Sequence, residues 1–164
     1  EALSDDTLLS TLDDWLGPLL VGKRRLSDIA ADALHSALWA LLGWDGQQQL
    51  AKLAPAQFCS PAGTAHEIDY AANAGPTVTL RVQALFGLSE HPVIGPERTP
   101  LVLSLTSPAG RPIQTTRDLP GFWRGSWADV AKDMRGRYPR HNWPDDPTQA
   151  VASLKTKKAL DRRG

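Results

Sequence analysis

Aromatic and basic side chains alternate in the last third of the sequence, and this mixture could bind single-stranded nucleic acid. Between residues 122 and 147, Trp123, Trp127, Tyr138 and Trp143 are interleaved with arginines. Aromatic rings can stack on bases while guanidinium groups neutralise phosphates. A second interpretation stays open, because Trp123 and Trp127 also fit the apolar face of a helix that packs on a core.

The charge distribution points to the same part of the chain. The net charge is zero, but residues 1–110 carry 6 Lys and Arg against 12 Asp and Glu, whereas residues 111–164 carry 12 against 6. A basic C-terminal third favours an anionic partner, with nucleic acid as the leading class, although a solvated basic face would give the same count. The candidate RNA-binding residues are Arg117, Arg124, Arg135, Arg137, Tyr138, Arg140, Trp143, Lys155, Lys157 and Lys158.

Motifs for catalysis or metal binding are weak. Residues 17–23 match most of the phosphate-binding pattern GxxxxGK[ST], but position 24 is Arg, the segment follows a predicted helix, and Pro18 has no amide to offer a phosphate. No two histidines have metal-ligand spacing, and no serine lies in a GxSxG elbow. The sequence therefore predicts no catalytic residue, no metal site and no cofactor in this chain.

Helices are expected in the first third of the chain. Ser4 is a natural N-cap for a first helix, which Gly17 and Pro18 should end. Ser27 should cap a second helix with a wide apolar stripe, and Gly43 should end it. A short third helix completes this helical region.

Strands and turns follow the helices. The tetrapeptide Ser-Pro-Ala-Gly occurs at 60–63 and again at 107–110, with the residues that a type I turn prefers, so each copy should close a hairpin. A further strand is indicated by alternating apolar and polar residues at 77–84. A helix is indicated at 120–135, where apolar residues recur at helical spacing. The expected hairpins are 57–59 with 65–71 and 101–106 with 112–117, the further strand is 77–84, and the helix is 120–135.

The order of these elements predicts an α+β fold. A helical N-terminal subdomain should pack on a small, mainly antiparallel sheet, followed by a C-terminal helix and an extended basic tail. The expected divisions are a helical subdomain over 1–55, a β-rich subdomain over 56–148 and a basic tail, a candidate for disorder, over 149–164. The chain has one cysteine and no long apolar run, so we expect a cytoplasmic protein without a disulfide framework or a membrane partner.

The segment 136–147 is expected to run as an extended clasp, because its prolines exclude a regular helix or a central strand. Tyr138 and Trp143 are the large apolar groups that could anchor it. If these rings dock on the domain they should be buried, and if they stack on bases they should be exposed. Asp145 and Asp146 are expected to pair with nearby arginines.

A resemblance to a known family rests on six segments of the second half of the chain. They are 81–87, 100–108, 111–114, 116–119, 122–123 and 136–147. Together they resemble the C-terminal domain of bacterial HrpB-type DEAH-box ATP-dependent RNA helicases, over about residues 10–148. The resemblance implies that ATP and magnesium bind in RecA-like domains upstream of this chain, and that no catalytic residue can be carried over to it.

Two functions from different classes follow. In the first, the chain is an accessory domain that holds or positions single-stranded or structured RNA next to the upstream RecA-type motor. In the second, it is a structural or protein-interaction domain that docks on the helicase core in cis or recruits a partner, with no direct RNA contact. The helical N-terminal region and the proline-rich loop at 87–100 are its candidate surfaces. An independent small enzyme has the least support.

Overall fold

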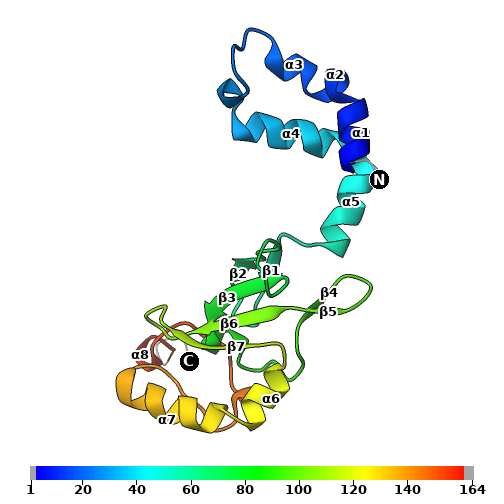
Figure 1. Ribbon diagram of the computed structural model, residues 1–164. Helices are drawn as coiled ribbons and strands as arrows, with labels where there is room; N and C mark the ends of the chain where they lie inside the picture. Colours follow the sequence, from blue (N-terminus) through cyan, green and yellow to red (C-terminus); the bar gives the residue numbers. More distant parts are fainter. Residues whose placement is uncertain (1–2, 161–164) are drawn as a thin grey trace. The chain divides into compact units, whose positions relative to one another are not determined.

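The structure is a computed structural model that describes residues 3–160, and the chain divides into two compact units (Figure 1). The first is Glu1–Leu53 and the second Ala54–Gly164. The second unit takes in the stretch from residue 149 that the sequence sets apart as a tail. The packing of the helical subdomain on the sheet stays a prediction.

The first unit is helical. Its elements are α1 (Asp5–Ser10), α2 (Leu12–Trp15), α3 (Gly17–Leu20), a 3-10 turn (Leu26–Asp28), α4 (Ala31–Leu41) and α5 (Gly43–Leu53). Ser4 caps α1 as predicted, because its hydroxyl accepts a hydrogen bond from the Thr7 amide at 3.4 Å. As predicted, the helix that contains Trp15 ends immediately before Gly17 and Pro18, because α2 stops at Trp15 and Leu16 is its C-cap. The sequence did not indicate that Gly17 and Pro18 also begin a further helix. They open α3, where proline is tolerated because the first turn of a helix has no use for its amide.

The start of α4 also differs from the prediction. Ser27 lies inside the 3-10 turn instead of capping a helix, and the N-cap position of α4 is Ala30. Asp28 holds this turn, since its carboxylate accepts hydrogen bonds from the Arg24 and Arg25 amides at 3.3 and 3.2 Å. The predicted end is confirmed: α4 stops two residues before Gly43, which has a φ of 61°.

Seven short strands lie in the described part of the second unit, residues 54–160. They are β1 (Gln57–Cys59), β2 (Ala65–Glu67), β3 (Thr77–Arg81), β4 (Val93–Ile94), β5 (Thr99–Pro100), β6 (Val102–Thr106) and β7 (Pro112–Thr116). Both predicted hairpins are confirmed, because β1 pairs with β2 and β6 with β7 in antiparallel register. In each turn the glycine amide donates to the serine carbonyl at 2.9 Å, Gly63 to Ser60 and Gly110 to Ser107. Both glycines have a positive φ, which other residues adopt with strain.

The central sheet has the order β3-β6-β7, and β3 runs parallel to β6 (Figure 1). The α+β class is confirmed, and between the named strands of residues 3–160 the β3–β6 pairing is parallel and the β1–β2, β4–β5 and β6–β7 pairings are antiparallel. The predicted strand 77–84 is too long. The chain leaves the sheet after Arg81 and forms a buried 3-10 turn, Val82–Leu85. The short β4-β5 hairpin lies in the segment that the sequence predicts as a loop.

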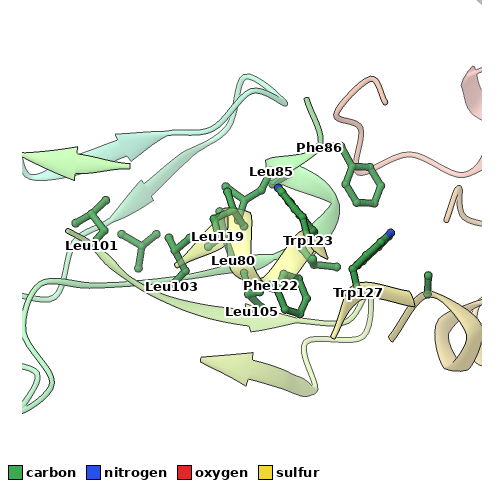
Figure 2. Packing of buried hydrophobic residues seen from close by; sticks show 14 of the residues in the cluster. Leu80, Leu85, Phe86, Leu101, Leu103, Leu105, Leu119, Phe122, Trp123 and Trp127 are labelled. Atoms are coloured by element: carbon green, nitrogen blue, oxygen red, sulfur yellow. The ribbon is translucent and has the colours of Figure 1, made fainter. Parts of the chain in front are cut away.

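Two helices, α6 (Leu119–Arg124) and α7 (Trp127–Arg137), replace the single one predicted at 120–135. Gly125 separates them, with φ −99° and ψ −89°. Figure 2 shows leucines of the sheet together with aromatic side chains of these helices in one hydrophobic core. The Trp123 and Trp127 rings meet edge to face at a centroid distance of 5.3 Å. The apolar interpretation of these two rings is thus confirmed.

Asp118→Ala should lower the free energy of unfolding of the second unit by about 1 kcal/mol. Asp118 is the N-cap of α6, and its carboxylate accepts a hydrogen bond from the Gly121 amide at 2.9 Å. Urea unfolding followed by tryptophan fluorescence measures the change. Glu90→Ala, which removes an exposed carboxylate outside any helix, serves as the control and should have no measurable effect.

Residues 147–160 follow the surface of the second unit. They contain a 3-10 turn, Pro147–Gln149, and a last short helix, α8 (Lys157–Leu160). Ala150, Ala152 and Leu154 pack against the core, and the Gly87 amide donates to the Pro147 carbonyl at 2.8 Å. This differs from the expectation of disorder from residue 149, because these three apolar side chains, which precede the lysines, give the segment a face to bury. Residues 161–164 lie outside the described residues.

Across residues 3–160, no helix is both long and apolar enough to cross a bilayer.

Candidate nucleic-acid interface

Trp143 anchors the clasp from inside the domain. Its side chain is only 4% exposed, and its ring lies 6.4 Å from that of Trp127. The indole nitrogen donates a hydrogen bond to the Tyr138 carbonyl at 2.9 Å. A ring held in this way offers no face to a base, so the docking alternative agrees with the structure. Trp143 is therefore removed from the RNA-binding candidates.

Arg135 supports the same anchor. Its Nε and Nη2 atoms donate to the Trp143 carbonyl at 3.1 and 2.9 Å, and Nη2 also pairs with Asp145. The predicted ion pair of Asp145 is thus confirmed. The one predicted for Asp146 is wrong, because this carboxylate accepts from the Thr148 amide at 2.9 Å and caps the following turn. Hydrogen bonds from the Thr148 side chain and backbone lower the pKa of Asp146.

Three further candidates have structural partners. Arg137 forms an ion pair of 3.0 Å with Asp133 one helical turn earlier. The Tyr138 hydroxyl lies 3.2 Å from the Ser107 hydroxyl, and Arg117 donates to the carbonyl of residue 74. The contacts of Arg137 and Arg117 lower the number of cationic groups that are left for a ligand, and the contact of Tyr138 holds its hydroxyl against Ser107.

The remaining candidates are Arg124, Arg140, Lys155, Lys157 and Lys158. All five are exposed, and none has an ion-pair partner between residues 3 and 160. Arg124 ends α6, whereas the other four lie near one another on the clasp and the segment after it. The side chains of Arg140, Lys157 and Lys158 meet at one hollow, whereas Lys155 lines a separate cavity with Ala62 and Thr64.

Arg140, Lys157 and Lys158 line one hollow of about 540 Å³ together with Thr156, and we name it the cationic hollow. A hydrogen bond of 2.8 Å from the Lys157 amide to the Arg140 carbonyl joins the two segments that form it. No carboxylate belongs to its described lining. The three cations and the one hydroxyl of this site can donate hydrogen bonds to phosphate oxygens. Sequence reasoning missed Thr156, although its position between Lys155 and Lys157 was a readable signal.

His141 lies beside this hollow, next in sequence to Arg140. Burial and the nearby charge of Arg81 lower the pKa of His141 below its ordinary 6.5, while a hydrogen bond with the Lys155 backbone acts in the opposite direction. Arg81, a residue of β3 that the sequence did not mark, is therefore close enough to His141 to affect its pKa.

The second unit should lose stability as the pH falls below about 6.5. Because the pKa of His141 is lower in the folded state, the unfolded state binds the proton more strongly, and acidification favours unfolding. His141→Gln should reduce this loss, as measured by urea midpoints across the pH series. Part of the dependence should remain, since burial also lowers the pKa of His66. An unchanged pH profile in the variant would refute the assignment to His141.

Residues 15–147 match the family model described as the ATP-dependent helicase C-terminal domain. The chain belongs to this family. It is 42% identical over 157 residues to the ATP-dependent RNA helicase HrpB of Escherichia coli strain K12. The aligned region covers 96% of this chain and 19% of that protein. The resemblance seen in the sequence is thus confirmed.

Two solved structures are similar to the chain. A crystal structure of the E. coli DExH-box NTPase HrpB matches with a TM-score of 0.83 and 41% identity, over 95% of this chain and 19% of the other. A crystal structure of the Escherichia coli DEAH/RHA helicase HrpB matches with a TM-score of 0.65 and 39% identity, over 86% of this chain and 18% of the other. The chain spans about a fifth of these proteins and corresponds to an accessory C-terminal domain of the helicase.

Proposed function

We propose that this chain is the domain by which an ATP-dependent RNA helicase holds RNA through its phosphate backbone, next to an upstream RecA-type motor. ATP and magnesium would bind in that motor, outside this chain. The domain's contribution is affinity and position. The proposal rests on the family membership and on one observation in the second unit, the cationic hollow.

The cationic hollow suits phosphodiester groups for a physical reason. Each lysine or arginine that neutralises a phosphate releases counterions, and this release supplies most of the sequence-independent affinity for nucleic acid. The three cations of the hollow are exposed, so they need little desolvation to reach a ligand. A carboxylate in the lining would cancel part of this attraction, and the described lining contains none.

The hollow is also held in place by the core of the domain. Arg140 follows the clasp residue Tyr138, whose carbonyl binds the buried Trp143. Lys157 follows Leu154, which packs on the same core. A phosphate bound between these segments would have a fixed position relative to the sheet, as positioning of RNA beside a motor requires.

Binding of a fluorescein-labelled single-stranded RNA to the chain, followed by anisotropy at low ionic strength, tests the proposal. Amide chemical shifts recorded during the same titration locate the contact. We expect saturable binding and the largest shifts at Arg140, Thr156, Lys157 and Lys158. Absence of binding, or shifts confined to the first unit, would refute it.

A second function has separate support in the first unit. None of its helices contains a fully buried residue, and Val21, Leu26 and Trp44 are 80%, 70% and 74% exposed. Exposed apolar side chains mark a protein interface where they form a contiguous patch. Among the described large apolar side chains of the second unit, only Tyr70 and Val151 are exposed, so the described surface of that unit is poor in apolar groups. These observations favour docking on the upstream helicase domains.

Docking can be measured by adding the upstream helicase domains as a separate polypeptide. The wild-type chain should co-elute with them in gel filtration, and a Val21→Asp/Trp44→Asp variant should not. RNA binding of the isolated chain should be the same for both forms, because these residues lie outside the unit that carries the cationic hollow. Co-elution of the variant would contradict docking through this surface.

A further inference from the structure

A cavity of about 320 Å³ lies between strand β7 and helix α7, on the second unit, and we name it the β7–α7 groove. Half-buried Ile113 and Val130 and buried Met134 form its apolar part. Exposed Arg111 and Asp129 belong to its polar part. A cavity with an apolar floor and a few polar groups is the usual form of a small-molecule site, and this one is near the lower limit of their sizes.

The polar groups of the groove differ along its length. Asp129 and Tyr138 lie nine residues apart along α7 and its C-cap, so they are at opposite ends of the groove. The Tyr138 end holds the Ser107 hydroxyl at 3.2 Å, and the Arg111 amide donates to that same hydroxyl at 3.2 Å. The backbone of Arg111 and two hydroxyls therefore lie at one end, and the Asp129 carboxylate lies at the other.

The two charged groups that could meet a ligand are not engaged elsewhere. Asp133 is already paired with Arg137 at 3.0 Å. Arg111 and Asp129 form no ion pair within the described part of the chain. The groove thus combines one available cation, one available anion and an apolar surface between them.

An added peptide strand does not suit this site. β7 is an edge strand, but it begins with Pro112, which has no amide to donate to a neighbour. Its register with β6 also shifts between Leu105 and Thr106, and such an irregularity twists an edge away from further pairing. The volume of the groove fits one compact group better than several extended residues.

We propose that the β7–α7 groove binds one unstacked nucleotide of RNA. Its base lies on Ile113, Val130 and Met134, Asp129 accepts hydrogen bonds from the exocyclic amino group, and Arg111 binds the phosphate. Proteins that recognise a particular RNA sequence generally bind unstacked bases through hydrogen bonds to the Watson–Crick edge. This inference rests on the proposed function and extends it from the backbone to a base.

The carboxylate of Asp129 makes the groove selective among bases. Guanine offers an N–H and an amino group side by side, which a carboxylate can accept together, and uracil presents carbonyl oxygens beside its one N–H. We therefore expect guanine to bind best and uracil worst. One well-formed pair of this kind discriminates by about tenfold or more.

Titration of the 164-residue chain with GMP and with UMP, followed by the methyl signals of Ile113, Val130 and Met134, tests the inference. GMP should shift these signals with about tenfold higher affinity than UMP. Asp129→Asn should abolish the difference between the two nucleotides. Asp13→Asn, which removes an exposed helical carboxylate in the first unit, is the matched control and should preserve it.

A second variant separates the two ends of the groove. Arg111→Gln should weaken GMP and UMP equally and leave guanosine, which has no phosphate, unaffected. Methyl shifts that are the same for all nucleotides, or that appear only with an extended peptide, would overturn the inference. Because mononucleotides do not need the cationic hollow, loss of RNA binding with intact GMP shifts would count against the proposed function alone.

Discussion

Trp143→Ala is expected to lower the free energy of unfolding of the second unit by about 3–5 kcal/mol. The indole is one of the most buried side chains of the clasp, and it packs on Trp127. Its removal leaves a cavity and also frees the Tyr138 carbonyl, which accepts its N–H at 2.9 Å. Such a loss is a large share of the stability of an ordinary domain. Thermal and urea unfolding of the whole chain measure it.

Trp44→Ala provides a control with the same change of side chain. Trp44 is 74% exposed in the first unit, so its removal should change stability by less than about 0.5 kcal/mol. If Trp143→Ala left stability intact and weakened RNA binding instead, Trp143 would be a stacking residue and the clasp would need another anchor.

The variant Arg140→Ala/Lys157→Ala/Lys158→Ala should weaken binding of single-stranded RNA by roughly tenfold to a hundredfold. All three side chains line the cationic hollow and are exposed. An exposed charge pair contributes up to about 1 kcal/mol, so three of them together approach about 3 kcal/mol. The same variant should unfold at the wild-type temperature, because the side chains make no ion pair among residues 3–160.

The matched control for this variant is Lys23→Ala/Arg24→Ala/Arg25→Ala. It removes the same number of positive charges from an exposed turn of the first unit. Its RNA affinity should stay close to that of the wild type. Equal losses in the two variants would mean that overall charge, and not the hollow, determines binding.

Local turn chemistry made part of the fold predictable. The two Ser-Pro-Ala-Gly segments specify their own turns, because a serine carbonyl, a proline and a glycine with positive φ act within four residues. The N-cap at Ser4 was predictable for the same reason, since donor and acceptor lie three residues apart. The same local reasoning failed at Ser27, which lies inside a 3-10 turn instead of capping α4.

Pairings between distant segments were not predictable. The parallel register that places Leu80 opposite Leu105 joins strands that are separated by a 3-10 turn and the β4-β5 hairpin. The break at Gly125 lies between Phe122 and Trp127, whose rings meet in the core at a centroid distance of 6.1 Å, and periodicity alone does not reveal that meeting. Both features follow from tertiary contacts that a local pattern does not contain.

The candidate site was predicted only in part, because composition does not show which cations the fold itself uses. Arg135 and Arg140 have the same chemistry and lie in the same basic segment. The fold gives Arg135 two hydrogen bonds to the Trp143 carbonyl and leaves the Arg140 side chain in the hollow. Their different roles depend on the path of the clasp.

The most direct test of the proposed function is the salt dependence of RNA binding. For single strands, the slope of log K against log salt changes by about 0.7 for each phosphate that the protein neutralises. We expect this slope to be steeper, by about 2, for the wild-type chain than for Arg140→Ala/Lys157→Ala/Lys158→Ala. The control variant Lys23→Ala/Arg24→Ala/Arg25→Ala should keep the wild-type slope. Equal slopes for the wild type and the hollow variant would contradict the proposal that these three side chains hold the RNA backbone.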